Sequence, residues 1–242
     1  IGLSFTDNKK PLISSRLTPR IQRLGLDGFE DYLALISAPD DGGEFQVAVD
    51  LLTTNETYFF REPAHYELLE QELTSSKPAQ LRVWSAASSF GDEAYSTAML
   101  LSDMQQQGRI GGDWTILGTD ISDRVLRSAT EAIYPEDRLR HVSPERLRRY
   151  CLRGEDESEG LVQIHPRLLE HVSFGQLNLC QPVDDIGPFD VIFLRNVLIY
   201  FDNNAKAQIV RRVLGQLKPQ GVLYTGHAES LSTLNLPVKA LA

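Results

Sequence analysis

The sequence predicts an α/β protein built on a Rossmann-like, doubly wound parallel sheet. An apolar strand at residues 81–86 runs into a turn of small residues that ends at Gly91, and a helical segment follows. A second strand, at residues 116–120, ends on the acid Asp120. In doubly wound sheets this order places a nucleoside-like ligand at the turn and an acid on its ribose hydroxyls. The alternative is an ordinary strand, turn and helix with an incidental acid.

The other elements follow from periodicity and from turn residues. Helices are predicted at residues 29–37, 94–107, 123–132 and 205–217, and in a short segment from Ser143 to near Arg153. Ser122 is the predicted N-cap of the third helix. Strands are predicted at residues 190–194 and 222–226, and the alternation of residues 161–165 predicts a strand outside the main sheet.

Turn-forming residues at positions 39–43 separate a small helical domain from the rest of the chain. We expect an N-terminal helical domain over residues 1–46, truncated at its start because the chain begins at Ile1 without a methionine. Residues 47–242 then form the sheet domain. A small β-subdomain is expected as an insertion at about residues 143–174, where the doubly wound pattern is interrupted.

The turn after the first strand indicates which ligand the sheet holds. A dinucleotide fingerprint needs three glycines beside a pyrophosphate, whereas this turn has Gly91 alone, followed by Asp92 and Glu93. These two acids would repel a phosphate and favour a cationic ligand. Asp120 also follows Gly91 at a longer separation than the roughly 20 residues of dinucleotide folds. S-adenosyl-L-methionine has a sulfonium, an ammonium and a ribose but no phosphate, so it fits these features.

Composition limits the alternatives. The chain has 242 residues, 42% of them hydrophobic, which is enough for one large domain with a smaller companion. Its net charge of -9 argues against general nucleic-acid binding. Cys151 and Cys180 have neither the spacing of a disulfide framework nor that of a zinc site, so no metal is expected. We find no apolar run of the length of a membrane span and no signal peptide, and we expect a cytoplasmic monomer.

The N-terminal segment is locally basic although the chain as a whole is acidic. Arg16, Arg20 and Arg23 recur at helical spacing on one face of a predicted helix, and apolar residues such as Leu17 and Ile21 lie on the other face. Such a stripe is either a solvated helix face or a docking face for an acidic partner.

Five motifs, in order along the chain, carry a family resemblance. They are LTTNETYFFRE at residues 52–62, VWSAA at 83–87 with GDE at 91–93, LGTDI at 117–121, LNL at 177–179 and FDVIFLRNVLIYF at 189–201. Together they resemble the chemotaxis protein methyltransferase (CheR) family, and the resemblance covers nearly the whole chain. The turn departs from the family pattern, which usually has Cys or Ala at Ser88, Thr or Ser at Phe90, Glu or Gln at Asp92, and Pro at Ala94.

The resemblance implies an enzyme that transfers a methyl group from S-adenosyl-L-methionine to glutamate side chains of bacterial chemoreceptors. Such a protein-glutamate O-methyltransferase releases S-adenosyl-L-homocysteine. Because a glutamate is already ionised at neutral pH, we expect no general base. By matched position, Arg61 and Tyr200 are expected to hold the acceptor carboxylate. The alternatives are a salt bridge for Arg61 and core packing for Tyr200.

The same resemblance implies the cofactor contacts. Asn55, Thr57 and Arg61 line the methionine end, Glu93 meets the amino-acid or sulfonium region, Asp120 takes the ribose, and Asn178, Leu179, Asn196 and Val197 surround the adenine and its neighbours. For Asn196 the alternative role is loop capping. His227 and Glu229 are weaker candidates for the cleft, with an exposed loop as the alternative.

Two partner contacts also follow from the resemblance. The family's N-terminal helices face the acidic helical bundle of the receptor, so the basic helix is expected to contact it. In some members the exposed edge of the inserted β-subdomain pairs with a short peptide at the receptor's C-terminus. Here the acids of residues 155–159 would repel an acidic tail unless they point away. Two other function classes stay open: a cofactor-binding adaptor without methyl transfer, and a methyltransferase acting on a small molecule.

Overall fold

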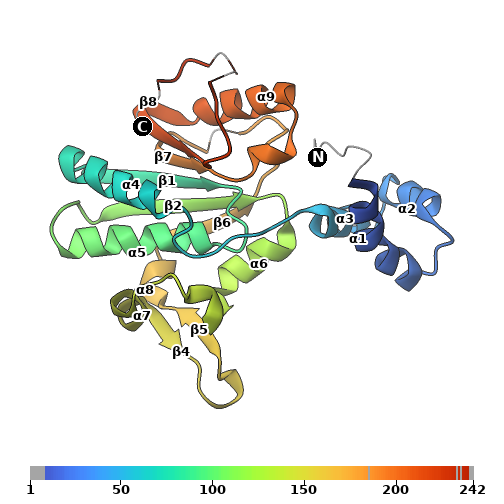
Figure 1. Ribbon diagram of the computed structural model, residues 1–242, viewed down its shortest axis with the longest axis horizontal. Coiled ribbons are helices and arrows are strands. Elements are labelled where there is room, and N and C mark those ends of the chain that lie inside the picture. Colours follow the sequence, from blue (N-terminus) through green and yellow to red (C-terminus); the bar gives the residue numbers. More distant parts are fainter. Residues whose placement is uncertain (1–8, 185, 233, 235, 240–242) are drawn as a thin grey trace.

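The computed structural model describes residues 9–184, 186–232, 234 and 236–239. Figure 1 shows three parts: a group of helices, α1 to α3, set to one side, a central sheet flanked by helices, and a small subdomain that projects beyond the sheet. An extended segment connects α3 to the helices of the sheet domain. Across the described residues, no helix has the length and hydropathy of a membrane span.

The N-terminal helices form their own small core. They are α1 (Lys10–Arg23), α2 (Phe29–Ile36) and α3 (Glu44–Leu52). The side chains of Leu17, Ile21, Tyr32 and Ala48 are buried between them. The domain boundary expected near residue 46 falls inside α3. The whole of α3 belongs with the N-terminal helices, because its Ala48 is buried in their core. The first eight residues of the expected domain lie outside the described residues.

In the described chain, five parallel strands form the central sheet in the order β6-β2-β1-β7-β8. They are β1 (Gln80–Ala86), β2 (Asp113–Asp120), β6 (Val172–Gln176), β7 (Phe189–Leu194) and β8 (Leu217–Thr225). β1 pairs with β2 on one side and with β7 on the other, so the strand order reverses at β1. The predicted doubly wound α/β fold is confirmed, and its ligand crevice is expected at the carboxyl ends of the central strands.

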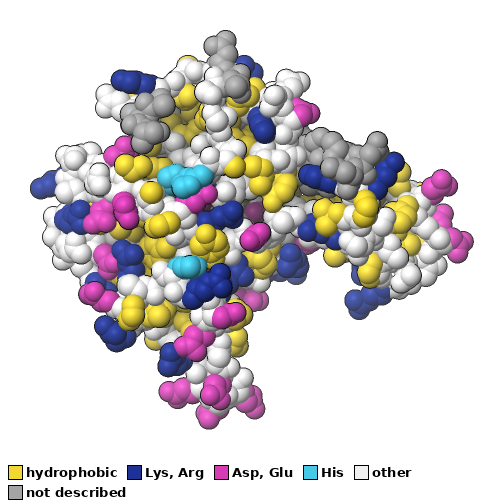
Figure 2. Space-filling view, in the orientation of Figure 1, with side chains coloured by type: hydrophobic (Ala, Val, Ile, Leu, Met, Phe, Trp, Pro, Cys, Tyr) yellow, Lys and Arg dark blue, Asp and Glu magenta, His cyan; other side chains and the backbone are white. Residues whose placement is uncertain are grey.

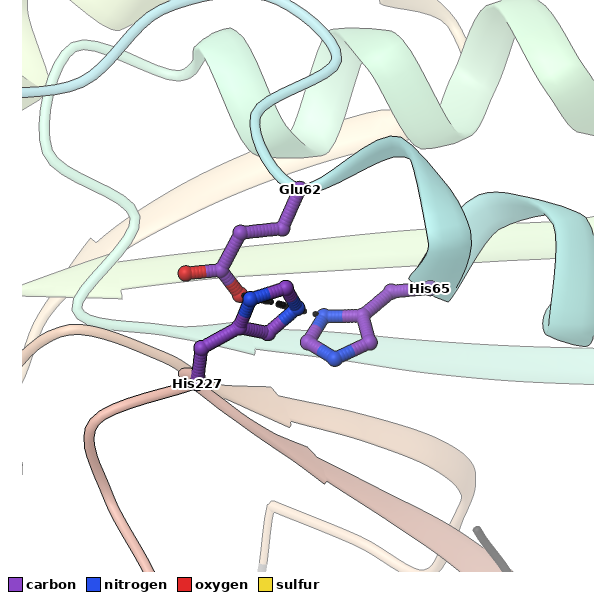
Figure 3. A group of neighbouring side chains, drawn as sticks. All are labelled: Glu62, His65 and His227. Atoms are coloured by element: carbon purple, nitrogen blue, oxygen red, sulfur yellow. Dashed lines mark ion pairs between the residues drawn. The ribbon is translucent and has the colours of Figure 1, made fainter.

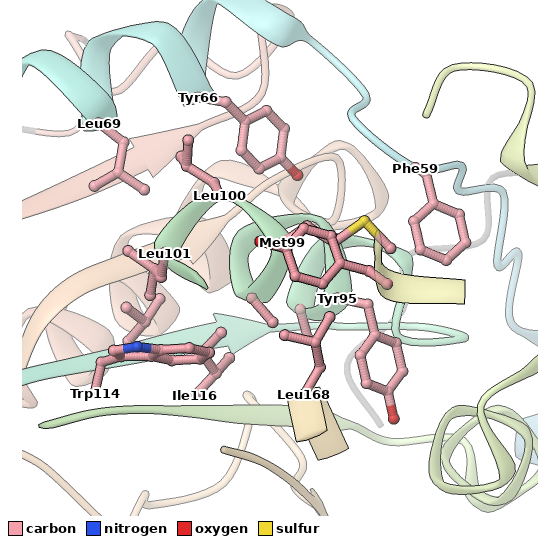
Figure 4. Close-up of a cluster of buried hydrophobic side chains, with 14 of the residues drawn as sticks. Phe59, Tyr66, Leu69, Tyr95, Met99, Leu100, Leu101, Trp114, Ile116 and Leu168 are labelled. Atoms are coloured by element: carbon pink, nitrogen blue, oxygen red, sulfur yellow. The ribbon is translucent and has the colours of Figure 1, made fainter. Parts of the chain in front are cut away.

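Helices cover both faces of this sheet. They include α4 (Pro63–Ser76), α5 (Asp92–Gln106), α6 (Asp123–Glu131) and α9 (Asn203–Leu214). Side chains of β1 alternate between two cores: Leu81 and Val83 belong to the core with α4 and α5, while Trp84 and Ala86 belong to the core with α9. Figure 4 shows the first core, in which aliphatic and aromatic side chains surround Met99. Burial on both faces explains why apolar side chains stand at consecutive positions of these strands, as at Val83 and Trp84 in β1 and at residues 191–194 in β7.

The helices and strands predicted from the sequence are present, with ends that differ by a few residues. Ser122 caps α6 as predicted, because its Oγ accepts a hydrogen bond of 3.4 Å from the backbone N–H of Val125. Three short strands have no counterpart in the predictions: β6, β3 (Ile133–Pro135) and β4 (Cys151–Arg153), whose residues were predicted as the end of a helix. β3 and β4 have three residues each, too few for alternation to identify a strand, whereas β6 is defined by its pairing with β2.

The inserted subdomain contains a three-stranded antiparallel sheet in the order β3-β5-β4. Its elements after β3 are η2 (Glu136–Leu139), α7 (Pro144–Tyr150), β4 (Cys151–Arg153), η3 (Asp156–Ser158), β5 (Leu161–Ile164) and α8 (Pro166–Leu169). The strand predicted outside the main sheet is β5. The subdomain begins at β3, upstream of the expected residue 143, and ends before β6, because β6 pairs with β2 in the main sheet.

Candidate functional site

An open pocket lies at the carboxyl ends of β1, β2, β6 and β7. It holds about 1180 Å³ of space between protein atoms, part of it open to solvent. The lining residues are 52–57, 61, 87–89, 93, 120–121, 177–179, 195–197 and 200–201, together with Lys9 and Leu12. The pocket therefore occupies the switch point of the sheet, and the N-terminal helices contribute one of its walls.

The ten residues that the sequence assigned to cofactor or acceptor all line this pocket. They are Asn55, Thr57, Arg61, Glu93, Asp120, Asn178, Leu179, Asn196, Val197 and Tyr200. The two weaker candidates are not among the lining residues. His227 is exposed, with 67% of its side chain accessible, whereas Glu229 is buried. The individual roles of the ten residues remain predictions.

The turn that follows β1 has a constrained backbone. Ala87 and Ser89 have φ angles of 68° and 51°, in the left-handed region that side chains disfavour, and Gly91 has a φ of 87°. The turn is held by hydrogen bonds from the Ser88 N–H to the Thr119 carbonyl and from the Ser89 N–H to Asp120. Residues in such conformations concentrate at functional sites, because the surrounding contacts must stabilise them. Here they form the wall of the pocket.

Asp120 lies at the end of β2, held in place by the backbone. Its Oδ2 accepts from the Ser89 N–H at 2.9 Å, and its Oδ1 accepts from the Ser122 N–H at 3.0 Å. Burial raises the pKa of Asp120, and the backbone hydrogen bonds oppose this rise. Each carboxylate oxygen can accept a second hydrogen bond, so the side chain can take two further donors such as ribose hydroxyls.

A buried arginine joins two acids at the wall of the pocket. Arg195 has only 2% of its side chain exposed, and its Nη1 donates to Glu93 Oε2 at 3.0 Å. Its Nη2 lies 3.3 Å from Glu62 Oε2 and donates to the carbonyl of Arg61. Burial raises the pKa of Glu93, although Arg195 and a hydrogen bond from Ser85 favour its ionised form. We call Glu62, Glu93 and Arg195 the shared-arginine cluster.

Sequence reasoning missed Arg195 as a site residue. It follows the buried strand β7 directly, and a charged side chain at such a position needs a charged partner. That signal was present in the sequence, but it does not say which acid the arginine meets. The partners come from segments far away in the chain, at positions 62 and 93.

Asp92 corrects the sequence argument, which put both acids of the turn beside the ligand. The side chain of Asp92 is fully buried away from the pocket and accepts from Arg138 Nε and Nη2 at 2.7 and 2.9 Å. The Arg138 guanidinium also lies 4.5 Å from the ring centre of Phe90. The family departures at Phe90 and Asp92 therefore face the inserted subdomain, whereas Ser88 lines the pocket.

The segment that follows β7 is anchored by Glu229. Its Oε2 accepts from the N–H groups of Asn196 and Gly226 at 2.6 and 2.8 Å, and its Oε1 accepts from that of Leu198 at 2.7 Å. Asn196 has a φ of 58° and donates from Nδ2 to Glu62. A Cβ on Gly226 would lie 2.7 Å from that Nδ2 and from Glu229 Oε2, so a larger residue would displace Asn196 or Glu229. Glu229 is thus a buried anchor for Asn196, a role that the exposed-loop alternative did not foresee.

Arg61 and Tyr200 both line the pocket and are half-buried. The Arg61 Nη1 donates to the carbonyl of Glu56 at 2.8 Å, and its guanidinium lies 5.8 Å from the Tyr58 ring centre. Burial raises the pKa of Tyr200, and the Arg61 charge opposes the rise. The acid next to Arg61 in the sequence, Glu62, pairs with Arg195 instead.

The predicted basic face of α1 is largely used inside the protein. Arg16 donates to the carbonyls of residues 52 and 53 at 2.9 and 3.0 Å and to the hydroxyl of Thr54 at 3.0 Å. Arg20 forms a two-bond ion pair with Glu44, which also accepts from the Tyr32 hydroxyl at 2.8 Å. Arg23 is exposed. Arg16 therefore fixes the segment that leads into Asn55.

Two family models together match almost the whole chain. Residues 55–241 match the domain described as CheR methyltransferase, SAM binding domain, and residues 1–53 match CheR methyltransferase, all-alpha domain. The chain belongs to the CheR methyltransferase family. Its matched domain binds S-adenosylmethionine, which confirms the predicted cofactor.

Curated CheR relatives agree with this assignment. The chain is 41% identical to the Chemotaxis protein methyltransferase of Escherichia coli (strain K12) and covers 81% of it. It is 40% identical to the protein of the same name from Salmonella typhimurium and covers 80% of that chain. Both matches span 96% of the present chain. Chemotaxis protein methyltransferase 2 of Pseudomonas aeruginosa is 36% identical over 95% of this chain and 81% of its own. The activity is therefore S-adenosylmethionine-dependent methylation in chemotaxis.

The pocket fits S-adenosylmethionine chemically. Asn55 Nδ2 and Ser88 Oγ are buried without a hydrogen-bond partner among the described residues, and both residues line the pocket. Buried polar groups normally have partners, so these two atoms indicate a ligand. The lining also contains both acids and cations, including Asp120, Glu93 and Arg61. Charges of both signs match a ligand that has a carboxylate, an ammonium and a sulfonium.

Proposed function

We propose that this enzyme methylates glutamate side chains of bacterial chemoreceptors in the cytoplasm, as a protein-glutamate O-methyltransferase. The observation that carries the proposal is a single pocket that holds both groups of predicted residues. Arg61 and Tyr200, assigned to the acceptor, share it with the residues assigned to the cofactor. An adaptor that only binds the cofactor would have no need of the acceptor pair.

We assign the cofactor contacts from the groups that the pocket offers. Asp120 accepts the two ribose hydroxyls with its remaining lone pairs. Asn55 and Ser88 supply the buried donors, and Asn178, Leu179, Asn196 and Val197 surround the adenine. Glu93 faces the ammonium or the sulfonium, while Arg61 faces the carboxylate of the methionine end. Thr57 lines the same end of the pocket.

The chemistry needs positioning more than acid–base catalysis. The bound cofactor supplies a methyl group on a positively charged sulfur. An ionised glutamate oxygen forms a bond to the methyl carbon as the carbon–sulfur bond breaks, and the electron pair remains on sulfur in S-adenosyl-L-homocysteine. No proton moves in this step, because the acceptor glutamate is already ionised at neutral pH. Holding the two reactants in line can supply several kcal/mol of the barrier reduction, up to about 7–11 kcal/mol.

Arg61 and Tyr200 are proposed to hold the incoming carboxylate. A guanidinium has five N–H donors, and the hydrogen bond to the Glu56 carbonyl uses one of them. The Tyr200 hydroxyl can donate a further hydrogen bond to the same carboxylate. Because both side chains are only half-buried, we propose that a glutamate on a receptor helix reaches them from the solvent side.

The receptor is proposed to dock over the N-terminal helices, although fewer arginines are free to contact it than the sequence suggested. Of the three arginines on the basic face, Arg16 and Arg20 hold the protein's own atoms, so Arg23 is the arginine that we propose for the acidic receptor bundle. A second contact is proposed at β4, an edge strand of the subdomain sheet that can accept an extended receptor peptide. The exposed acids of residues 155–159 disfavour an acidic peptide.

Transfer of a labelled methyl group tests the proposal. The enzyme is incubated with labelled S-adenosylmethionine and a receptor cytoplasmic fragment, and mild base is then applied. We expect label on the fragment that base releases as methanol, because a glutamate methyl ester is base-labile, and no label when the acceptor glutamates are replaced by alanine. Cofactor binding without transfer would favour the adaptor, and label on a small molecule alone would favour the third function class.

A further inference from the structure

Three side chains that could bind a metal ion converge outside the cofactor pocket. Glu62 and His65 lie at the start of α4, and His227 follows β8, so the group joins two segments that are far apart in the sequence (Figure 3). The His65 Nδ1 lies 3.4 Å from Glu62 Oε2, and the His227 Nε2 lies 4.0 Å from the same oxygen. All three ligand atoms are within 4.8 Å of one another.

These separations are close to those around a zinc ion. Tetrahedral zinc holds nitrogen and oxygen ligands at about 2.0–2.1 Å, which puts the ligand atoms roughly 3.4 Å apart. The Glu62–His65 separation already has this value. The His227 Nε2 is farther away, at 4.0 Å from Glu62 Oε2, but its side chain is 67% exposed, so its ring is free to turn toward an ion. Its exposure also gives an ion a path from solvent.

Charge and hydrogen bonding leave room for a cation. Glu62 and Glu93 share the single guanidinium of Arg195, so the shared-arginine cluster carries a net charge of about -1 when both acids are ionised. His65 Nδ1 is buried and has no hydrogen-bond partner among the described residues.

We propose that Glu62, His65 and His227 form a binding site for a divalent transition-metal ion, with Zn²⁺ as the ion of best fit. Two imidazoles and one carboxylate are a common ligand set for zinc, and water takes the fourth position. No metal motif along the chain predicts this site, because Glu62 and His65 are far from His227 in the sequence. Glu62 also holds Asn196 and Arg195, so an ion here is coupled to the wall of the cofactor pocket.

Titration of the metal-free full chain with ZnCl₂ by calorimetry tests the site without cofactor or receptor. We expect one Zn²⁺ per chain in the parent. Loss of an outer-shell partner already costs about 10–100-fold in metal affinity, so His227→Ala, which removes a direct ligand, should weaken binding at least tenfold. Because His227 is exposed, this variant should keep the fold. His141→Ala is the matched control, since His141 is also exposed but belongs to no described cluster of metal ligands.

Two further measurements make the outcome decisive. Bound Zn²⁺ should raise the melting temperature of the parent and of His141→Ala, and should leave that of His227→Ala unchanged, because only the folded site binds the ion. Glu62→Gln should also weaken binding, since an amide is a poor zinc ligand. The proposal is overturned if the parent binds no Zn²⁺, or if His227→Ala and Glu62→Gln bind it as tightly as the parent.

Discussion

Asp92 and Glu93 are adjacent in the first turn of α5, yet their side chains belong to two different regions of the molecule. Asp92 lies in the joint between the sheet and the inserted subdomain, where both of its oxygens accept from Arg138. Glu93 lies at the pocket wall, where it shares Arg195 with Glu62. Consecutive residues of a helix point about 100° apart, which is enough to separate them.

The two regions differ in how completely their charges are paired. In the joint, one carboxylate meets one guanidinium in a two-bond pair that is buried on the acid's side. At the pocket wall, two carboxylates share a guanidinium whose Nε has no partner among the described residues. The comparison suggests that the closed pair serves the fold, whereas the open cluster serves a ligand. Figure 2 shows the face of the molecule on which charged side chains of both signs lie around apolar patches of the sheet domain.

The largest loss of stability is expected when the buried Asp92–Arg138 ion pair is broken. Arg138→Met leaves the Asp92 carboxylate buried without its partner, so we expect a loss of about 3–5 kcal/mol in the free energy of unfolding. Arg127→Met, which removes an exposed ion pair with Asp123, is the control and should cost less than about 1 kcal/mol. Denaturant unfolding measures both. A loss from Arg138→Met no greater than that of the control would remove the distinction between the two regions.

Mutations in the shared-arginine cluster should affect cofactor binding as well as stability. Arg195→Met removes charged hydrogen bonds to Glu93 and Glu62, and we expect a loss of about 1.5–3 kcal/mol in the free energy of unfolding. Unlike Arg138→Met, it should also weaken S-adenosylmethionine binding by about tenfold, and Arg195→Lys should recover part of that loss. Calorimetry on the folded variants gives the affinities. If Arg138→Met weakens cofactor binding as much as Arg195→Met does, the assignment of the two regions is wrong.

For Arg61, the question is whether it binds the acceptor carboxylate or only the cofactor. If it holds the acceptor carboxylate, Arg61→Ala should lower the turnover number at least about tenfold, or about 1.4 kcal/mol in the activation barrier. The dissociation constant for S-adenosylmethionine should change by less than that factor. Steady-state kinetics with a receptor fragment and a separate cofactor titration measure the two quantities. Equal losses would make Arg61 a cofactor ligand only.

The smallest effect is expected at a third pair, Arg20 with Glu44, in the N-terminal helices. The hydrogen bonds from Arg20 hold the pKa of Glu44 below its ordinary value, although burial opposes this. A lowered carboxyl pKa stabilises the folded state above the unfolded pKa, and this contribution is lost as the pH falls through the folded pKa. Glu44→Gln should therefore cost up to about 1 kcal/mol near pH 7, and the cost should shrink as the pH falls below the ordinary carboxyl pKa. A difference that grows toward acid pH would contradict this sign.

Much of the fold was predictable because its strands and helices carry strong local patterns. The buried strands β1 and β7 carry apolar residues at consecutive positions, and Ser122 marks the start of α6. The short strands β3 and β6 were not predictable, since pairing with β5 and β2 defines them. The domain boundary was expected just after the turn cluster at residues 39–43, because a turn cluster marks a chain reversal. Which core a helix joins depends on packing, and the burial of Ala48 shows that α3 joins the N-terminal core.

The residues of the candidate site also fall into a predictable group and an unpredictable group. Asp120 ends β2 and Asn196 follows β7, so their positions in the sequence were enough to predict that they line the crevice. The partners of charged residues were beyond sequence reasoning, because an arginine can meet any acid that the fold brings near it. Thus Arg195 was missed, Asp92 was misplaced, and Arg16 and Arg20 were read as a surface stripe although they bind the protein's own carbonyls and acids.

The central claim is that the pocket at the carboxyl ends of the strands holds S-adenosylmethionine with Asp120 on its ribose. Calorimetric titration of the parent, Asp120→Ala and Asp123→Ala with S-adenosylmethionine tests it most directly, since Asp123 is a nearby acid on α6 that does not line the pocket. We predict that Asp120→Ala weakens binding by about 1–3 kcal/mol, the effect of losing a charged hydrogen-bond partner. Asp123→Ala should bind like the parent. Binding by Asp120→Ala that equals that of the parent would contradict the account.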